Sequence, residues 1–253
     1  MGGMRQSVLI TGGAKRLGAA MARALAGAGY GVVIHANNSS GEAAALAAEL
    51  GGHVVLGDLA DPATPDRLIS EAMQKAGPLF GLINNASKFE FDKAGTITAE
   101  SVAAHLAPNL IAPVLLTQKF AATLAGERGV VINILDQKLS NLNPDFFSYT
   151  LTKAALAAAT EMFAMALAPK IRVCGIAPGI TMKAPKQTDE KFEKAWRANP
   201  LRRGSAPEDI AAAALFILNT PSVTGTTLTV DGGEHLLRRS RDVSHEAGIL
   251  SGE

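Results

Sequence analysis

The chain has 253 residues, of which 47% are hydrophobic and 19% charged, so it contains enough apolar material for a sizeable core and too little charge for a disordered chain. A formal net charge of +1 does not fit a nucleic-acid-binding protein. No continuous apolar run reaches the roughly 18 residues that cross a membrane, and residues 1–6 resemble neither a secretion signal nor a myristoylation site. The single cysteine, Cys174, excludes an intramolecular disulfide, fits the reducing cytoplasm where we expect this protein, and is interpreted as a core residue.

Predicted strands and helices alternate along the chain. Short β-branched and apolar runs indicate strands, and Ala- and Leu-rich stretches indicate helices. Strands are predicted at 7–11, 31–35, 53–56, 79–84, 129–135, 171–176 and 226–230, and helices at 17–28, 41–50, 65–75, 99–124, 148–167 and 207–218. The strands are apolar throughout, which is typical of a parallel sheet covered on both faces. The sequence therefore predicts an α/β fold: a single doubly wound Rossmann-type domain over residues 1–237, with a central parallel sheet of about seven strands and helices on both faces.

Two segments match no structural or functional pattern. Residues 182–200 are irregular, and no role can be assigned to them. Residues 238–253 form a polar C-terminal tail beyond the last predicted strand. We interpret this tail as a frayed end or, alternatively, as an arm that lies on a neighbouring subunit.

A glycine-rich turn joins the first predicted strand to the first helix. Gly12 and Gly18 allow a tight turn in which backbone N–H groups and the helix N-terminus face a pyrophosphate. An NAD-selective site has an acidic residue at the end of the second strand, but residues 35–39 contain none. Lys15 and Arg16 carry positive charges that can pair with a 2′-phosphate, although they could also form a solvated face. The pattern favours NADP(H) over NAD(H).

Tyr149 and Lys153 lie one turn apart at the start of a predicted helix, so their side chains share one face. A nearby ammonium group favours the phenolate, which makes the phenol a better proton donor. This spacing is common by chance, but here it follows a strand whose carboxyl end faces the predicted cofactor. We interpret Tyr149 as a general acid.

Together, these motifs resemble the short-chain dehydrogenase/reductase family over essentially the whole chain. The ordered matches are the glycine loop, Asp58, the Asn-Asn-Ala-Ser run at 84–87, Asn109, Tyr149 with Lys153, Pro178-Gly179 and Asp231-Gly232-Gly233. The resemblance implies that Tyr149 donates the proton, that Lys153 holds the nicotinamide ribose and lowers the pKa of Tyr149, that Asn109 holds a water molecule of the proton relay, and that the protein is a homotetramer. The cofactor-binding residues it implies are Gly12, Lys15, Arg16, Leu17, Gly18, His35, Asn37, Asn38, Ser39, Asp58, Leu59, Asn85, Ala86, Ser87, Tyr149, Lys153, Pro178, Gly179 and Ile180.

Three departures from the usual family pattern resemble the pteridine reductases within it. Arg16 replaces the middle glycine of the loop, Phe89 follows an Asn-Ala-Ser run, and Asp136 replaces the serine that stands thirteen residues before Tyr149. The ending at 231–236 also resembles bacterial dihydromonapterin reductases. The resemblance implies that Arg16 contacts the cofactor phosphate and the pterin, and that Phe89 stacks on the pterin opposite the nicotinamide. Ser87 would hydrogen-bond the pterin, and Asp136 would work with Tyr149 to protonate a ring nitrogen.

The function expected from this resemblance is NADPH-dependent reduction of a C=N bond in a dihydropterin-type small molecule. A carbonyl reductase of the 3-oxoacyl type is the alternative, because it shares every feature except Asp136 and Phe89. A catalytically silent NADP-binding sensor is a third hypothesis, and the intact Tyr149, Lys153 and Asn109 argue against it. The five histidines show no metal-ligand spacing, so no metal site is expected.

Overall fold

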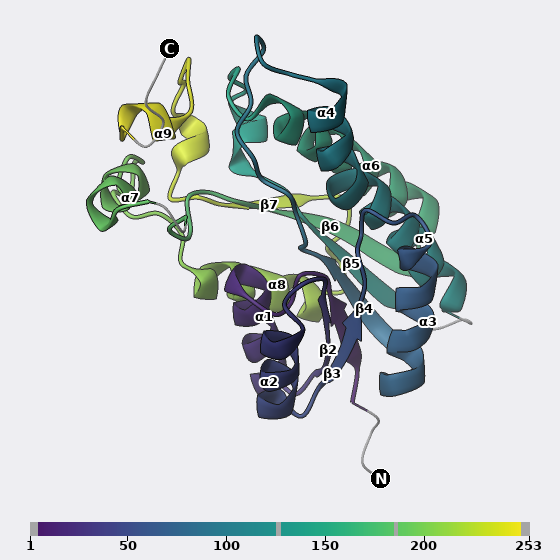
Figure 1. Cartoon of the computed structure of the whole chain (residues 1–253). Coiled ribbons are helices and arrows are strands. Elements are labelled where there is room, and N and C mark those ends of the chain that lie inside the picture. Colours follow the sequence, from purple (N-terminus) through teal and green to yellow (C-terminus); the bar gives the residue numbers. More distant parts are fainter. Residues whose placement is uncertain (1–4, 125–127, 185–186, 249–253) are drawn as a thin grey trace.

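Seven strands form one parallel sheet in a computed structural model that describes residues 5–124, 128–184 and 187–248. The strand order is β3-β2-β1-β4-β5-β6-β7 (Figure 1). The strands are β1 (Ser7–Ile10), β2 (Gly31–Ala36), β3 (His53–Leu56), β4 (Leu79–Asn84), β5 (Gly129–Ile134), β6 (Ile171–Pro178) and β7 (Thr227–Val230). Each neighbouring pair is parallel, so the predicted doubly wound sheet is confirmed.

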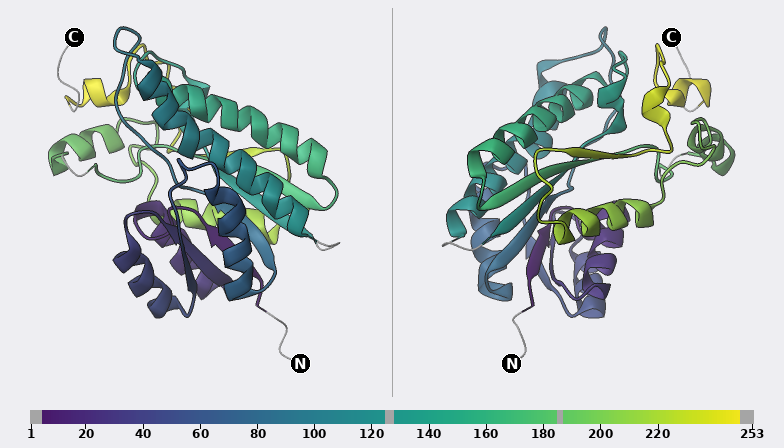
Figure 2. Two further views of the ribbon diagram at one scale, coloured as in Figure 1. Left: turned by 45° about the vertical axis from the view of Figure 1, so that its right-hand side comes forward. Right: turned by 180° about the vertical axis from the view of Figure 1, so that it is seen from behind.

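Helices cover both faces of the sheet (Figures 1 and 2). One face carries α1 (Arg16–Gly27), α2 (Ser40–Leu50) and α8 (Pro207–Asn219). The other carries α3 (Thr64–Ala76), α4 (Ala99–Leu106), α5 (Ala112–Thr123) and α6 (Phe147–Leu167). Successive residues of a strand point to opposite faces, so Val8 and Ile10 pack in one apolar layer and Leu9 packs in the other. Strands buried on both faces explain the unbroken apolar runs in the sequence.

The helix predicted at 99–124 is divided into three parts. A π-helical turn, η1 (Ala107–Ile111), separates α4 from α5 and contains Pro108, and Pro113 follows in α5. Proline has no N–H group to donate, so two prolines near one turn disturb the α-helical hydrogen bonds. Within the described residues, the stretch Ala99–Thr123 is long and apolar enough to cross a membrane by length and composition. Its Leu116 and Phe120 are fully buried in the apolar layer against the sheet.

The C-terminal tail is partly folded onto its own chain. Residues 238–248 include α9 (Val243–Glu246), and residues 187–200 include the unpredicted helix α7 (Asp189–Trp196). Val243 and Ala247 are buried in a small apolar cluster with Ala195 of α7. The interpretation of a frayed end is therefore wrong for residues 238–248, because the polar sequence hides two apolar contacts that anchor them. Residues 249–253 of the tail lie outside the described residues.

Candidate active site

The loops after β1 and β4 meet at the carboxyl edge of the sheet, where doubly wound folds bind their ligands. The Asn85 side-chain amide donates hydrogen bonds to the carbonyl oxygens of Thr11 (2.9 Å) and Gly12 (3.2 Å). In return, Thr11 Oγ1 accepts from the backbone N–H groups of Asn85 (2.9 Å) and Ala86 (3.0 Å). The structure thus joins two predicted cofactor-binding segments that are more than 70 residues apart.

The glycine loop leaves bare backbone at this edge. Gly12 has a φ of +60°, and a Cβ there would lie 3.0 Å from the Cα of Ala86. A Cβ on Gly18 would lie 2.2 Å from the carbonyl oxygen of Gly12. Both positions therefore require glycine, and the loop leads directly into the N-terminus of α1. Such a cradle of backbone and helix N-terminus fits the pyrophosphate of a dinucleotide.

His35 supports the glycine loop from inside the fold. Its Nδ1 accepts a hydrogen bond from the N–H group of Gly12 (3.1 Å), so Nε2 carries the proton that is donated to the carbonyl oxygen of Gly57 (3.0 Å). Burial lowers the pKa of His35, which keeps the imidazole neutral. Both ring nitrogens of this predicted cofactor-binding residue are engaged within the protein, where they join β2, the glycine loop and the end of β3.

The two cations of the glycine loop point to different neighbours. Lys15 Nζ forms an exposed ion pair with Glu42 at 2.7 Å. The Arg16 guanidinium donates to the carbonyl oxygens of Lys183 (3.0 Å) and Met182 (3.4 Å) and so joins the loop to the segment after β6. Arg16 has a φ of +52°, a left-handed backbone that glycine adopts without strain. Arg16 thus keeps the backbone conformation of the glycine that the family usually has at this position, and it adds a long cationic side chain to the loop.

The other predicted cofactor-binding residues lie along the same edge. Asn37, Asn38 and Asp58 are exposed, and Ser39 is half-buried. Leu17 is half-buried and Leu59 is buried. A Cβ on Gly179 would lie 2.7 Å from the Cβ of Asp231, so the turn after Pro178 packs closely against the end of β7. Ile180 instead packs with the apolar cluster of α7 and α9.

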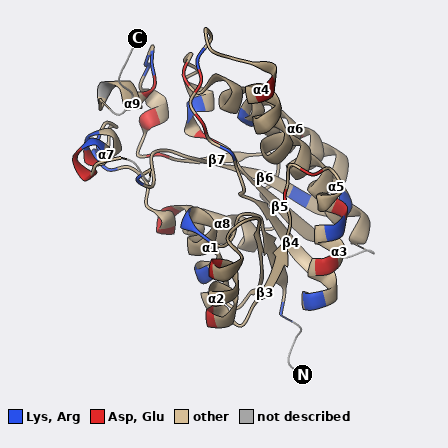
Figure 3. Cartoon of the chain, in the orientation of Figure 1, with Lys and Arg blue, Asp and Glu red and all other residues tan. Residues whose placement is uncertain are grey.

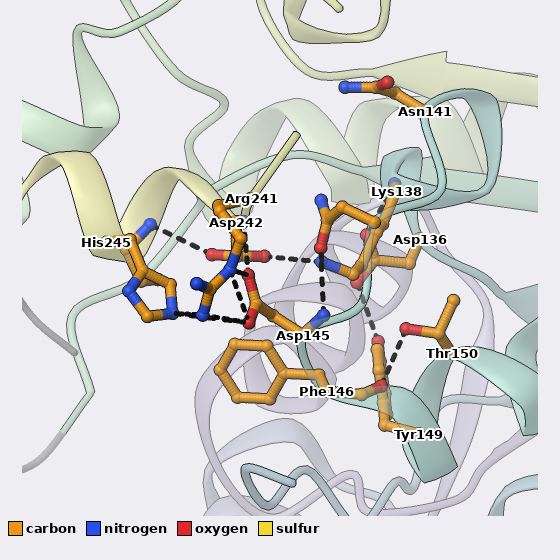
Figure 4. A network of polar contacts seen from close by, with 12 residues as sticks. Asp136, Lys138, Asn141, Asp145, Phe146, Tyr149, Thr150, Arg241, Asp242 and His245 are labelled. Carbon is orange, nitrogen blue, oxygen red and sulfur yellow. Dashed lines mark hydrogen bonds and ion pairs between the residues drawn. The ribbon is translucent and has the colours of Figure 1, made fainter. Parts of the chain in front are cut away.

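Tyr149 and Asp136 form a hydrogen-bonded pair at the end of β5 (Figure 4). Tyr149 Oη donates to Asp136 Oδ2 at 2.8 Å, and Asp136 Oδ1 accepts from the N–H group of Lys138 at 2.8 Å. Asp136 lies two residues after the end of β5, and Tyr149 is in the first turn of α6. The predicted partnership of the two side chains is thus seen as a direct contact.

Burial shifts the pKa of each group in this part of the site. It raises the pKa of Asp136 and lowers that of Lys153 to about 8. The pKa of Tyr149 lies well above its usual value of 10, because the phenol is buried and the Asp136 carboxylate opposes a second negative charge. Lys153 Nζ donates to the carbonyl oxygen of Ile134 (2.7 Å) and lies 5.6 Å from the centre of the Tyr149 ring. Burial and the adjacent carboxylate thus dominate the pKa of Tyr149 in this structure, and the lowering by Lys153 that the resemblance implies stays a prediction.

Asn109 uses its side chain to hold the loop after β4. Its Oδ1 accepts from the N–H group of Lys88 (2.7 Å) and from Ser87 Oγ (3.2 Å). Its Nδ2 donates to the carbonyl oxygen of Lys88 (2.9 Å) and to Thr152 Oγ1 (3.1 Å). The fully buried amide thus connects η1, α6 and the loop that precedes Phe89.

Phe89 reaches the Tyr149–Asp136 pair from that loop. Its ring stacks on Phe146 with a centroid distance of 4.3 Å and meets Tyr149 edge-on at 4.7 Å. Phe146 is buried and has a φ of +53°, whereas Phe89 remains 56% exposed. An exposed aromatic ring therefore lies beside the Tyr149–Asp136 pair, and such a ring can stack on a planar ligand.

A network of ion pairs, which no sequence pattern indicates, connects this site to the C-terminal segment (Figure 4). Arg241 donates to both carboxylate oxygens of the fully buried Asp145, at 2.7 and 2.9 Å. Lys138 Nζ pairs with Asp242 at 2.8 Å. Asp145 directly precedes Phe146, so the network fixes the loop between Asp136 and Tyr149. Within the residues that the structure describes, no group of three His, Cys, Asp or Glu side chains is placed to hold a metal ion.

The family model described as enoyl-(acyl carrier protein) reductase matches residues 12–235. The chain belongs to the short-chain dehydrogenase/reductase family of oxidoreductases, which confirms the resemblance seen in its motifs. One similar solved structure is the crystal structure of FolM alternative dihydrofolate reductase 1 from Brucella canis complexed with NADP. The two sequences are 39% identical, the TM-score of the two folds is 0.87, and the match covers 94% of this chain and 97% of that chain. Pteridine reductase 1 of Leishmania tarentolae is 30% identical over 91% of this chain and 96% of its own length. The 3-oxoacyl-[acyl-carrier-protein] reductase of Bos taurus is 32% identical over 90% of this chain and 97% of its own length.

Proposed function

We propose that this protein is an NADPH-dependent reductase of a C=N bond in a dihydropterin-type substrate. The observation that carries the proposal is the 2.8 Å hydrogen bond from Tyr149 to Asp136. A carbonyl reductase needs a neutral donor beside the developing oxyanion, which a serine hydroxyl supplies and an ionised carboxylate does not. An imine nitrogen needs a proton, and a carboxyl group paired with a phenol can deliver one.

The cofactor site fits a dinucleotide through Gly12, Gly18 and the N-terminus of α1. When bound, NADPH supplies the hydride that the substrate carbon accepts. NADPH is favoured over NADH because residues 35–39, at the end of β2 and directly after it, contain no acidic side chain, whereas Lys15 and Arg16 of the glycine loop carry positive charges that can pair with a 2′-phosphate. Lys153, with a pKa of about 8, is mostly protonated at neutral pH and can hold the ribose hydroxyls.

On the protein side, Tyr149 turns its phenolic proton from Asp136 to the ring nitrogen. A proton that Asp136 takes up from solvent, favoured because burial raises its pKa, then restores the phenol across the same contact. The exposed ring of Phe89 would stack on the flat pterin and hold its nitrogen near Tyr149. The similar Brucella and Leishmania proteins are a dihydrofolate reductase and a pteridine reductase by name, which supports this substrate class.

We also propose that the protein is a cytoplasmic homotetramer. Leu151, Met162 and Met165 of α6 are exposed. Lys153 and Glu161 are the only charged residues of this helix, so its ribbon is largely tan (Figure 3). An exposed apolar face of this kind is a site where a second copy can pack. Light scattering should give a particle mass four times that of the 26.2 kDa chain. Cell fractionation should recover the protein in the cytoplasmic fraction. A monomeric mass would contradict the assembly.

The decisive experiment measures NADPH oxidation with dihydropterins, dihydrofolate, and acyl and quinone carbonyls. The wild type should prefer a pterin, and Asp136→Ser should lower pterin reduction by about tenfold or more. Tyr149→Phe is the reference for loss of the proton donor. If the wild type reduces acyl ketones and ignores every pterin, the protein is a carbonyl reductase, as its similarity to the bovine 3-oxoacyl reductase allows. NADPH binding without turnover of any substrate would indicate a sensor.

A further inference from the structure

The C-terminal segment, residues 238–248, binds the stretch of chain that directly precedes α6 (Figure 4). The Arg241 guanidinium donates to both carboxylate oxygens of Asp145, and the N–H group of Asp242 donates to Asp145 Oδ2 at 2.7 Å. His245 Nε2 lies 3.3 Å from Asp145 Oδ1 and 2.6 Å from Arg241 Nη2. Several residues of the C-terminal segment thus meet one fully buried carboxylate.

These contacts hold the backbone at Phe146, the residue after Asp145. Phe146 has a φ of +53°, a left-handed conformation that is strained for a bulky side chain and persists only where neighbouring contacts maintain it. Its carbonyl oxygen accepts hydrogen bonds from the N–H group (2.9 Å) and Oγ1 (2.7 Å) of Thr150. Lys138 Nζ lies 5.8 Å from the centre of its ring and pairs with Asp242 at 2.8 Å. The C-terminal segment therefore reaches Phe146 through both its backbone and its ring.

Phe146 in turn supports the ring of Phe89. The two rings are nearly parallel, with an angle of 14° between their planes and a centroid distance of 4.3 Å. Phe146 is buried, whereas Phe89 is an exposed side chain on the loop after β4. An exposed side chain has several rotamers in water, and a stack against a fixed ring selects among them. Phe146 thus preorganises Phe89 for contact with a ligand.

The C-terminal segment also reaches the loop of Phe89 directly. The rings of His245 and Phe91 meet at an angle of 61° with a centroid distance of 6.3 Å. Phe91 meets Phe146 edge-on at 5.2 Å, and Phe91 is two residues from Phe89 along the chain. These rings form one cluster, and its exposed member, Phe89, lies 4.7 Å from the ring of Tyr149. The end of the chain is therefore coupled by contact to the ring that borders the proposed substrate site.

We propose that Arg241 and His245 are positioning residues of the substrate site, which act through Phe146 and Phe91 to hold the ring of Phe89 against a flat heteroaromatic substrate. The proposal rests on the proposed function. The C-terminal segment controls the orientation of Phe89, so its contacts contribute to the binding of a planar ligand rather than to NADPH binding or proton transfer. A flexible acyl chain has no ring to stack and gains little from this orientation. The segment therefore makes the site selective for planar substrates.

Steady-state NADPH oxidation tests the effect on the substrate. Arg241→Gln should raise KM for a dihydropterin by about three- to tenfold, while kcat and the Kd of NADPH stay within about twofold. Arg241→Lys, which keeps a cation beside Asp145, should recover most of the affinity. A purely structural loss would lower the amount of active enzyme, and so the apparent kcat, and would leave KM unchanged. The matched control is Arg23→Gln, because Arg23 also donates to both carboxylate oxygens of its partner, Glu49, at 2.9 and 2.8 Å.

A double-mutant cycle tests whether Arg241 acts through Phe89. Phe89→Ala alone should raise KM for the pterin, and the addition of Arg241→Gln should raise it no further. His245→Gln, which removes the ring contact with Phe91, should raise KM in the same direction, and it serves as the test if Arg241→Gln does not fold. A KM equal to that of the Arg23→Gln control in either folded variant, or independent effects of Arg241 and Phe89 in the cycle, would overturn the proposal.

A measurement without substrate separates this proposal from the proposed function. Fluorine NMR of the full chain labelled with fluorophenylalanine should contain a signal from Phe89, identified by its absence in Phe89→Leu. That signal should shift in Arg241→Gln and His245→Gln and stay in place in Arg23→Gln. An unchanged signal in both variants would refute the positioning of Phe89. If the wild type reduces no pterin, the proposed function fails, and the fluorine spectra still decide whether the C-terminal segment holds this ring.

Discussion

Removal of Arg241 should destabilise the protein through the buried carboxylate of Asp145. Burial by itself raises the pKa of Asp145, but the hydrogen bonds from Arg241, the N–H group of Asp242 and the charge of His245 outweigh burial and lower it to about 2. Arg241→Gln removes the cation and its two-point contact and leaves a carboxylate that is 0% exposed. The variant is therefore destabilised, because the buried charge of Asp145 is left incompletely paired.

The magnitude follows from the same pKa. Each tenfold change in acidity corresponds to about 1.4 kcal/mol, so a decrease from 3.8 to about 2 stabilises the folded chain by roughly 2 kcal/mol at neutral pH. Because the folded pKa is below the unfolded one, this contribution is present above about pH 4 and is lost as the pH falls through about 2. Breaking a buried pair by removal of one partner typically costs about 3–5 kcal/mol. We expect Arg241→Gln to lower the free energy of unfolding by about 2–4 kcal/mol at pH 7.

Urea unfolding at pH 7 and at about pH 3 measures this effect. The matched control is Arg197→Gln, since Arg197 forms an exposed ion pair with Glu193 at 2.7 Å, which should contribute at most about 1 kcal/mol. A double-mutant cycle with Asp145→Asn isolates the coupling between Arg241 and Asp145. The reasoning is refuted if Arg241→Gln is as stable as the control at pH 7, or if the cycle gives no coupling.

Three further outcomes test the site. NADPH should bind at least about tenfold more tightly than NADH in fluorescence titrations, and Arg16→Ala should abolish most of that preference; equal affinities in the wild type would contradict the assignment. The rate constant kcat/KM should fall as the pH rises through about 8, because Lys153 then loses the proton with which it holds the ribose; a flat profile between about pH 7 and pH 9 would exclude this role. Phe89→Ala should raise KM for a pterin several-fold while NADPH affinity stays within about twofold, because stacking is worth roughly 0.5–1.5 kcal/mol. The exposed Phe216 on α8 provides a control, as Phe216→Ala should leave KM unchanged.

The parts of the site that local patterns encode were predictable. Tyr149 and Lys153 share a helix face because of the helical repeat, and Asp136 follows a buried strand whose carboxyl end can face only one edge of a parallel sheet. The glycines at 12 and 18 are required by close backbone approach, which a βα turn imposes locally. The sequence by itself therefore determined the sheet and the edge at which the site lies, whereas the partnership of Asp136 with Tyr149 was implied by the resemblance to the pteridine reductases.

Other features depend on which loops meet, and no local spacing encodes that. Arg241 contacts Asp145 across 96 residues, and the short 3₁₀ helix Glu234–Leu236 packs against the one at Gln137–Ser140. The rise in the pKa of Tyr149 likewise depends on burial and on the distance to Asp136, both of which exist only after packing. Secondary structure follows from short-range patterns of polarity and backbone preference, whereas electrostatic partners are set by the tertiary approach of distant loops. Only the tertiary structure decided which residues hold the Tyr149–Asp136 pair in place and how the pKa of Tyr149 is shifted.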